Sequence, residues 1–264
     1  MQLPYMIRAY GHRVLGDVPM RIRTGTNRGM KWSAAALGRG YGSGTFARER
    51  LAALETVVRA GDTFWDVGAH KGFVSLAAAR MVGADGHVVA VEPSATNLGF
   101  LRRHLEWNGA TSIRVLPVAL SDTPGQAAFG GRGSSVAFRL GEGPESVRVE
   151  TLCALVEEQG LPRPTVLKLD VEGEEAAVLR GTGRLLGGDL ALLVSTHGRE
   201  LYEECRALLL ERDFRVFDSW EAATRRASGA PWASDHDLLA IGPARVVDEV
   251  AIRTSRLIAG LRRH

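Results

Sequence analysis

Cysteine is scarce in this chain of 264 residues, which contains only Cys153 and Cys205. A disulfide framework or a zinc site would need more ligands at closer spacing, so we interpret both as buried thiols. No apolar run is long enough to span a bilayer. Arg and His interrupt residues 1–16, which therefore lack the apolar stretch of a signal peptide. We expect a cytoplasmic protein that does not contact a membrane.

Net charge is also low, at +3. Residues 245–264 carry five Arg against Asp248 and Glu249, so the rest of the chain is electrically balanced. A protein that binds nucleic acid usually has a broader basic surface, and we therefore expect no nucleic-acid partner. Apolar residues recur at helical spacing in the same segment, which predicts a basic amphipathic helix over residues 245–264. We expect it to pack on the domain or on a second copy of the chain, as in a homodimer.

From Gly61 onwards, short apolar segments alternate with segments of helical periodicity. Strands are predicted at residues 64–67, 88–91, 113–118, 166–170, 190–196, 214–217 and 238–241, and helices at residues 74–81, 95–107, 174–186 and 201–212. Fully apolar strands that alternate with helices indicate a parallel sheet covered on both faces. No helix separates the last two strands, so the final strand is expected to run antiparallel.

These segments divide the chain into three parts. Residues 1–58 form an N-terminal extension with short strands, a glycine-rich loop and a helix, residues 59–244 form the main domain, and residues 245–264 form the C-terminal helix. Residues 122–147 interrupt the main domain, and their Gly and Ser content predicts a loop insertion that can contain a small hairpin at residues 126–129 and 136–139. A long loop at the carboxyl end of a sheet often covers a substrate, so we expect a mobile lid, with disorder as the alternative.

The strongest local signal is the segment Asp66–Gly72, which reads DVGAHKG and lies between a strand and a helix. Gly68 permits a tight turn, and Gly72 lets the helix start close to a ligand. Unpaired backbone N–H groups in such a turn suit an anionic carboxylate. The spacing G-x-x-x-G differs from G-x-G-x-x-G, which weakens a dinucleotide interpretation.

Glu92 ends the next strand, roughly 20 residues beyond the glycine turn, where an acidic residue can accept hydrogen bonds from ribose hydroxyls. We expect its replacement to affect folding little, on the assumption that a carboxylate at a strand end buries little. Nicotinamide cofactors and S-adenosylmethionine both carry a ribose diol. These two features alone therefore leave the cofactor open.

Asp170 and Glu172 follow the fourth core strand, in the segment KLDVEG. Alternation along the strand places them with Lys168 on one side, at the edge where open α/β sheets hold ligands. Two carboxylates there can bind a cofactor's ammonium group, orient a nucleophile or hold a divalent metal ion. The alternative is a structural salt bridge with Lys168.

His197 ends the following strand, LALLVSTH, above the same edge of the sheet. A histidine at this position is a candidate general base, although a lone histidine is more often structural.

Taken in order, these residues resemble the FkbM family of methyltransferases. The resemblance runs from about residue 25 to residue 241 and rests on six segments: DVGAHKG at 66–72, VEPSATNLGFLRRHLEWNG at 91–109, VALSD at 118–122, GSS at 133–135, LKLDVEGEEAAVLRG at 167–181 and STH at 195–197. His70 stands where many members have Asn, and His104 stands near another position that is usually Asn. Thr196-His197 replaces a more common acidic-x-His.

The resemblance implies a class I methyltransferase of Rossmann-like fold, with a seven-stranded, mostly parallel sheet, an antiparallel last strand and helices on both faces. It implies S-adenosylmethionine as methyl donor and S-adenosylhomocysteine as product. It places Asp66, Gly68, Gly72, Glu92 and Asp122 at the cofactor, and we add His70, Pro93, Asn97, Ser121 and Asp170 there. It places Asp170, Glu172 and His197 at the acceptor, and we add Ser134 and Ser135 of the loop insertion.

We therefore expect an O-methyltransferase that acts on a hydroxyl of a small molecule, such as a sugar or a natural product. His197 is the favoured base, supported by Asp170 and Glu172. A metal is not expected, because Mg²⁺ prefers oxygen ligands and a histidine suits it poorly, but Mg²⁺ held by the same three residues is the alternative. Two other functions stay open: a methyltransferase acting on nucleic acid or protein, and a non-catalytic protein that binds an adenosyl or nicotinamide nucleotide.

Overall fold

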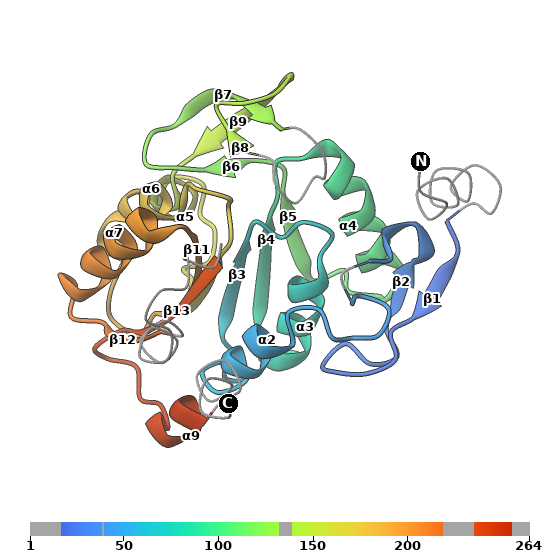
Figure 1. The fold of residues 1–264 in the computed structure, drawn as a ribbon, viewed down its shortest axis with the longest axis horizontal. Helices are drawn as coiled ribbons and strands as arrows, with labels where there is room; N and C mark the ends of the chain where they lie inside the picture. The colour runs from blue at the N-terminus through green and yellow to red at the C-terminus, as the bar shows by residue number, and fades with distance from the viewer. Residues whose placement is uncertain (1–16, 39, 132–138, 219–234, 255–264) are drawn as a thin grey trace, which may run out of the picture.

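The computed structural model describes residues 17–38, 40–131, 139–218 and 235–254. Its centre is a seven-stranded sheet in the order β12-β13-β11-β10-β3-β4-β5 (Figure 1). In this order the strands are Arg215–Asp218, Asp235–Ile241, Ala191–His197, Val166–Leu169, Thr63–Val67, His87–Val91 and Ile113–Leu116. β13 runs antiparallel to both neighbours, and the inner strands pair in parallel. This topology confirms the predicted class I methyltransferase fold.

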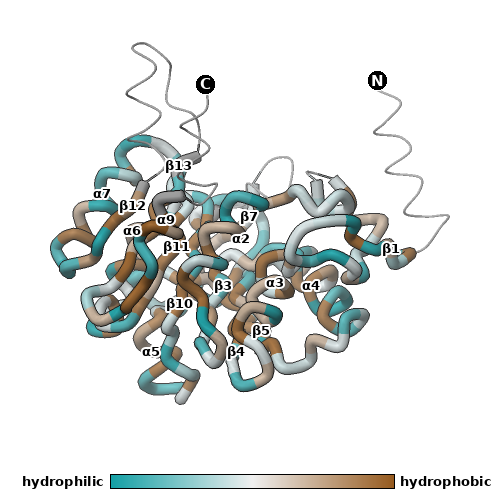
Figure 2. The backbone as a smooth tube through the Cα atoms, turned by 90° about the horizontal axis from the view of Figure 1, so that it is seen from below, coloured by the Kyte–Doolittle hydropathy of each residue, from teal (hydrophilic) through white to brown (hydrophobic). Residues whose placement is uncertain are grey.

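Helices cover both faces of this sheet, as the apolar strands require. One face carries α2 (Arg48–Leu54), α3 (Phe73–Val82) and α4 (Ala95–Trp107); the other carries α5 (Leu152–Glu157), α6 (Glu175–Gly181) and α7 (Arg199–Leu210). Successive strand residues enter opposite halves of the core: Phe64 packs in one apolar cluster and Trp65 in the other, and neither is exposed to solvent. The hydrophobic colour in Figure 2 accordingly gathers along the central strands.

The N-terminal extension packs against α4 and the start of α3. It contains β1 (Pro19–Arg21), β2 (Lys31–Ser33), the 3-10 turn η1 (Ala34–Ala36) and α2. The Trp32 ring stacks between Tyr41 and His104, with centroid distances of 5.0 and 3.7 Å. The backbone N–H of Ser33 donates to Nε2 of His104 at 3.0 Å. The extension therefore shares the core of the main domain and brings Tyr41 and α2 towards the carboxyl ends of the strands.

The interruption after β5 is a second sheet, which contains a hairpin beginning at the expected residues 126–129 and two further strands that were not predicted. β6 (Ala119–Leu120), β9 (Glu145–Glu150), β7 (Gly125–Gly130) and β8 (Arg139–Leu140) pair in that order above the carboxyl ends of the main strands. Phe129, Val147 and Val149 form its own small apolar cluster. Alternating apolar residues in ESVRVE already carried the strand signal, but the surrounding glycines obscured it. Ser134 and Ser135 lie outside the described residues.

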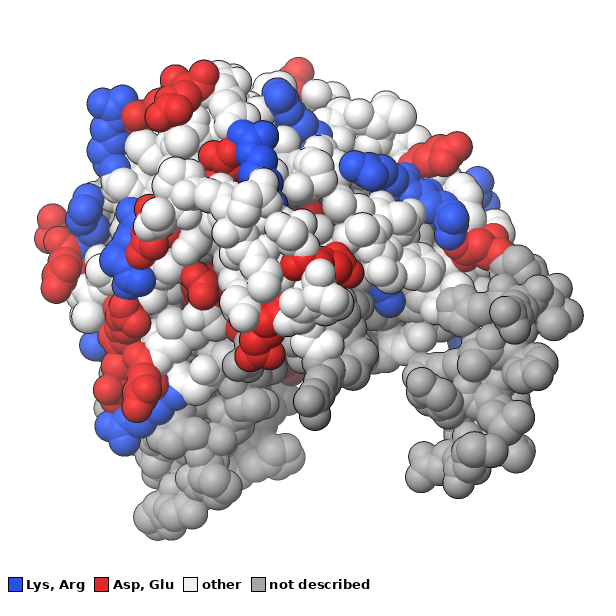
Figure 3. All heavy atoms as spheres, turned by 90° about the horizontal axis from the view of Figure 1, so that it is seen from above, with Lys and Arg blue, Asp and Glu red and all other residues white. Residues whose placement is uncertain are grey.

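The basic segment expected at residues 245–264 begins with a structural arginine. Arg245 is 1% exposed, and its guanidinium donates to Asp62 at 2.5 Å and to the carbonyl oxygen of Val57 at 2.6 Å. Beyond it the structure describes α9 (Glu249–Thr254). Figure 3 looks onto the molecule from above Figure 1 and shows acidic and basic side chains interspersed on that face. In the described part of the chain, no helix combines the length and apolar character needed to cross a membrane.

Candidate active site

A pocket opens at the carboxyl ends of the main strands, where the fold class holds its ligands. Every layer contributes to its wall, and the main contributors are the N-terminal extension, the glycine turn, the ends of β4, β10 and β11, and the second sheet. Among the residues expected at the cofactor or the acceptor, those that line the pocket are Gly68, His70, Glu92, Pro93, Asn97, Asp170, Glu172 and His197. Asp66, Gly72, Ser121 and Asp122 do not line it.

The glycine turn is tight, and both of its glycines are required by geometry. Gly68 has φ of +76°, and an added Cβ would overlap the carbonyl oxygen of Asp170. Gly72 has φ of +86°, caps the start of α3, and would place a Cβ against the Leu101 side chain. Any residue with a side chain would be strained at either position. Gly72 thus acts on the shape of the turn and does not reach the pocket itself.

The backbone N–H groups of this turn are mostly occupied by the protein. Gly68 and Ala69 both donate to the carbonyl oxygen of Val91 at 3.0 Å, and His70 donates to Glu92 at 2.8 Å. The N–H of Gly72 donates to the carbonyl oxygen of Ala69. The expected set of unpaired donors for a carboxylate is therefore wrong for these four groups.

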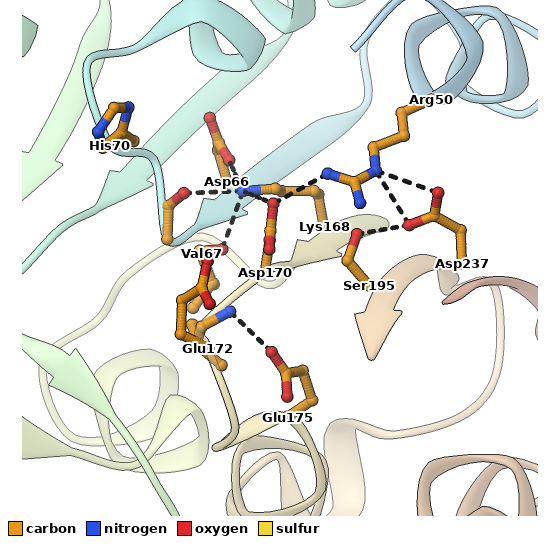
Figure 4. A network of polar contacts seen from close by, with 12 residues as sticks. Arg50, Asp66, Val67, His70, Lys168, Asp170, Glu172, Glu175, Ser195 and Asp237 are labelled. Carbon is orange, nitrogen blue, oxygen red and sulfur yellow. Dashed lines mark hydrogen bonds and ion pairs between the residues drawn. The ribbon is translucent and has the colours of Figure 1, made fainter. Parts of the chain in front are cut away.

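Asp66 lies beneath the turn and is fully buried. It does not line the pocket, so its position does not offer a direct contact with the cofactor. The Ser75 hydroxyl donates to its Oδ2 at 2.6 Å, and the ammonium of Lys168 lies 3.1 Å from its Oδ1. Lys168 also donates to the carbonyl oxygens of Val67 and Gly68 at 3.3 and 2.8 Å (Figure 4). Asp66 therefore anchors Lys168, and Lys168 ties β10 to the glycine turn.

Glu92 lines the pocket but is buried, with 4% of its surface exposed. Burial raises the pKa of its carboxyl. Three hydrogen bonds favour the charged form and lower the pKa, but the effect of burial is larger. The donors are the backbone N–H groups of His70 and Ser94 and the side-chain amide of Asn97, at 2.8, 2.9 and 3.1 Å. Because Glu92 fixes the turn, its replacement should disturb folding, contrary to the expectation from its place at a strand end.

Asn97 supports a donor-bearing ligand at this end of the pocket. Its side chain is 2% exposed and lines the pocket, and its Oδ1 has no hydrogen-bond partner among the described residues. A buried amide oxygen without a partner costs free energy until a donor reaches it. A carboxylate has about four acceptor positions, so Glu92 also keeps capacity beyond its three donors. Both residues therefore fit the hydroxyl-rich and amino-bearing adenosyl group.

Ser121 and Asp122 hold the protein together beside the pocket. The Ser121 hydroxyl donates to Glu174 at 3.0 Å. Asp122 is exposed and pairs with Arg180 at 3.0 Å, and this guanidinium lowers the pKa of the carboxyl. The pocket wall here is apolar instead, because Val118, Ala119, Leu120, Phe129 and Leu140 line it. The last four come from the second sheet, and sequence reasoning identified none of them as pocket residues.

At the opposite end of the pocket, three side chains converge as the sequence predicted. Nε2 of His197 lies 3.4 Å from Oε2 of Glu172 and 3.9 Å from Oδ1 of Asp170. Each of these three residues offers a ligand atom within 4.8 Å of the other two. Glu172 adopts φ of +57°, which is unusual for a residue with a side chain and common at functional turns.

Two further residues hold this cluster in place, and neither was identified from the sequence. Arg50 of α2 donates to Oδ2 of Asp170 at 3.2 Å and to Asp237 at 3.0 Å, and Ser195 donates to the same Asp237 at 2.6 Å (Figure 4). Glu175, fully buried, lies 3.3 Å from Nδ1 of His197. Arg50 is far away in sequence and carries no local signal, whereas Glu175 directly extends the KLDVEG segment.

The carboxylates around His197 decide its charge. Burial disfavours the imidazolium, but Glu175, Glu172 and Asp170 outweigh burial and raise the pKa of His197 to about 9. A general base must be unprotonated to accept a proton. The neighbouring carboxylates thus favour the protonated imidazole, and a histidine that serves as the base must be free of that proton.

The pocket thus combines a buried carboxylate and a buried amide at one end with a cluster of carboxylates and a histidine at the other. A family model described as the methyltransferase FkbM domain matches residues 66–216, more than half of the chain. The chain belongs to the FkbM methyltransferase family. The matched segment is a methyltransferase domain, as the sequence resemblance implied.

Individual relatives are more distant. The hexuronic acid methyltransferase AglP of Haloferax volcanii is 29% identical over 141 residues, which are 52% of this chain and 56% of that protein. The FkbM methyltransferase structure from Methylobacillus flagellatus KT is 19% identical, covers 68% of this chain and 43% of its own, and has a TM-score of 0.47. Aeropyrum pernix fibrillarin, solved with natively bound S-adenosyl-L-methionine, is 14% identical, covers 89% and 86%, and has a TM-score of 0.46.

Proposed function

We propose that this protein transfers a methyl group from S-adenosylmethionine to a hydroxyl of a sugar or sugar-bearing small molecule. The observation that carries the proposal is the position of Asp170, Glu172 and His197 in the same pocket as Glu92 and Asn97. S-adenosylmethionine supplies an electrophilic methyl group on a positively charged sulfur. The protein must bind the adenosyl group, align the acceptor oxygen and help it lose its proton.

Glu92 and Asn97 are the residues that we assign to the adenosyl group. The unpartnered Oδ1 of Asn97 suits a donor of the ligand, and the carboxylate of Glu92 suits a ribose hydroxyl. Phe129 and Leu140 of the second sheet offer an apolar wall for a flat base. This assignment replaces Asp122, whose carboxylate pairs with Arg180 outside the pocket.

The acceptor end suits a polyol. Asp170 and Glu172 can accept hydrogen bonds from adjacent hydroxyls, and both are partly exposed to the pocket, by 24% and 26%. Tyr41 and Phe46, whose ring centroids lie 4.1 Å apart, line the same pocket and offer apolar faces for a sugar ring. AglP is named for a sugar acid, which agrees with an acceptor of this class.

Methyl transfer to a hydroxyl breaks the bond from sulfur to the methyl carbon, forms a bond from oxygen to that carbon, and releases the hydroxyl proton. A carboxylate acceptor, which a hexuronic acid also offers, would release no proton and would yield an ester. The acceptor end carries carboxylates that would repel such an anion. We therefore favour the hydroxyl.

The test is mass spectrometry of sugars incubated with the protein and S-adenosylmethionine, with glucuronic acid, its methyl ester and glucose as probes. We expect a methylated product that survives mild alkali, as an ether does. An alkali-labile product would identify methyl ester formation and would contradict the assignment to a hydroxyl. In parallel, S-adenosylhomocysteine should raise the melting temperature, because a ligand of the native state stabilises it. A shift with NAD and none with S-adenosylhomocysteine would contradict the cofactor assignment.

A further inference from the structure

The acceptor end gathers carboxylates around a histidine. Three carboxylates, those of Asp170, Glu172 and Glu175, surround His197. Arg50 and Lys168 both approach the same oxygen, Oδ2 of Asp170, at 3.2 and 3.9 Å. The other oxygen of Asp170 faces His197. The two oxygens therefore have different partners: one pairs with fixed cations and the other turns to the cluster.

The distances in the cluster match the spacing of ligands around one metal ion. Oxygen and nitrogen ligands lie about 2.0–2.2 Å from a small divalent ion, so two ligands of one ion lie roughly 3–4 Å apart. Nε2 of His197 lies 3.4 Å from Oε2 of Glu172 and 3.9 Å from Oδ1 of Asp170. All three ligand atoms lie within 4.8 Å of one another, and the side chains line the pocket.

Glu175 provides a second, independent feature of a metal site. Histidines that bind metals usually donate their other ring N–H to a carboxylate, which fixes the ring orientation and the tautomer. Oε1 of Glu175 lies 3.3 Å from Nδ1 of His197. Glu175 is itself held by the backbone N–H groups of Val171 and Gly173, at 2.9 and 3.2 Å. The carboxylate is thus fixed behind the ring, and Nε2 is directed to Glu172 and Asp170.

We propose that Oδ1 of Asp170, Oε2 of Glu172 and Nε2 of His197 bind a divalent first-row transition-metal ion, best represented by Mn²⁺. Carboxylates suit both Mg²⁺ and Mn²⁺, whereas imidazole suits transition metals and is a poor ligand for Mg²⁺. Three ligands from one side leave coordination positions towards the pocket. The next step rests on the proposed function: these positions take the acceptor hydroxyl and a neighbouring oxygen of the sugar.

Such an ion would favour loss of the acceptor's hydroxyl proton in a site where His197 is a ligand and does not act as the base. An oxygen bound to a divalent ion has a much lower pKa than the unbound group. The acceptor hydroxyl can then lose its proton to solvent, and its oxygen attacks the methyl carbon as the bond from sulfur to that carbon breaks. In this arrangement His197 holds the ion and takes no proton.

The test is a titration of the full chain with Mn²⁺ after treatment with EDTA. Electron paramagnetic resonance monitors the titration, because it reports the Mn²⁺ that remains free in solution. Wild type should bind one Mn²⁺ per chain and bind Mg²⁺ more weakly. Glu172→Gln and His197→Ala should each weaken Mn²⁺ binding by at least 10-fold. Glu175→Gln should weaken it by about 10–100-fold, the usual effect of losing a carboxylate behind a histidine ligand. Glu203→Gln removes the same charge from an exposed site on α7 and should change nothing.

Binding of S-adenosylhomocysteine, measured on the same samples, separates this proposal from the function on which it rests. A wild type that binds S-adenosylhomocysteine but no Mn²⁺ overturns the metal site and leaves the methyltransferase function intact. Equal Mn²⁺ binding by wild type and by folded Glu172→Gln and His197→Ala also overturns the site. Mn²⁺ binding as expected, without methylation of any sugar, leaves the site standing and contradicts the proposed acceptor.

Discussion

The two ends of the pocket differ in how their charges are balanced. At the cofactor end, Glu92 accepts three hydrogen bonds and Asp66 pairs with Lys168 and Ser75, so each buried carboxylate has its partners within the protein. At the acceptor end, three carboxylates surround His197. The difference agrees with our proposal, in which the first end binds the adenosyl group and the second holds the groups that act on the acceptor.

The largest expected effect is on turnover at the acceptor end. His197→Ala should lower kcat by at least about 10²-fold, because the hydroxyl loses several kcal/mol of assistance towards deprotonation. The change should leave the affinity for S-adenosylhomocysteine within about 2-fold of wild type, since the residue lies away from Glu92. Steady-state kinetics and calorimetry measure the two quantities. A kcat close to that of wild type would remove His197 from the chemistry and erase the contrast between the two ends.

The next effect is on binding and stability at the cofactor end. Glu92→Gln should weaken S-adenosylhomocysteine by roughly 10–100-fold, or about 1.5–3 kcal/mol, the range for hydrogen bonds to a charged group. It should also lower the melting temperature. The side-chain amide of the new Gln would point an N–H group at one of the three N–H donors that Glu92 accepts from, and that hydrogen bond would be lost. Asp122→Asn is the matched control, since its carboxylate pairs with Arg180 outside the pocket. Equal losses in both variants would remove the special role of Glu92.

Sequence patterns predicted the regular parts of this molecule well. The apolar strands determined the sheet, and DVGAHKG, Glu92 and KLDVEG lie at its carboxyl edge as expected. Local periodicity could not show that Arg50, about 120 residues before Asp170, would reach it, because that contact depends on how the N-terminal extension packs. The strand β9 of the second sheet was missed because glycine content was given more weight than the alternation in ESVRVE. The partners of Asp66 and Asp122 also depend on packing, so their separation from the pocket could not be predicted.

The smallest expected effect contrasts two histidines. His104 accepts from Ser33 and has a pKa lowered to about 4, chiefly by burial, whereas the pKa of His197 is raised. Since the unfolded chain takes up a proton at His104 near pH 6.5 and the native chain does not, native stability falls as pH drops from about 6.5 towards 4.

Between pH 7.5 and 5.5 this loss should be about 1 kcal/mol at His104. The contribution of His104 is measured as the difference between wild type and His104→Asn in urea unfolding at the two pH values, because His197, whose pKa is raised, has the opposite pH dependence in both chains. An unchanged pH dependence in His104→Asn would show that other groups cause it and that His104 is not a titrating structural contact.

The most direct test of the division between the two ends is a paired binding measurement on Glu92→Gln and Glu172→Gln. Both changes neutralise one pocket carboxylate, and each folded variant is titrated with S-adenosylhomocysteine and, separately, with Mn²⁺. Glu92→Gln should lose affinity for S-adenosylhomocysteine and keep its affinity for Mn²⁺, and Glu172→Gln should show the reverse. If Glu172→Gln weakens S-adenosylhomocysteine as much as Glu92→Gln does, or if both variants bind Mn²⁺ alike, the division between a binding end and a reacting end is wrong.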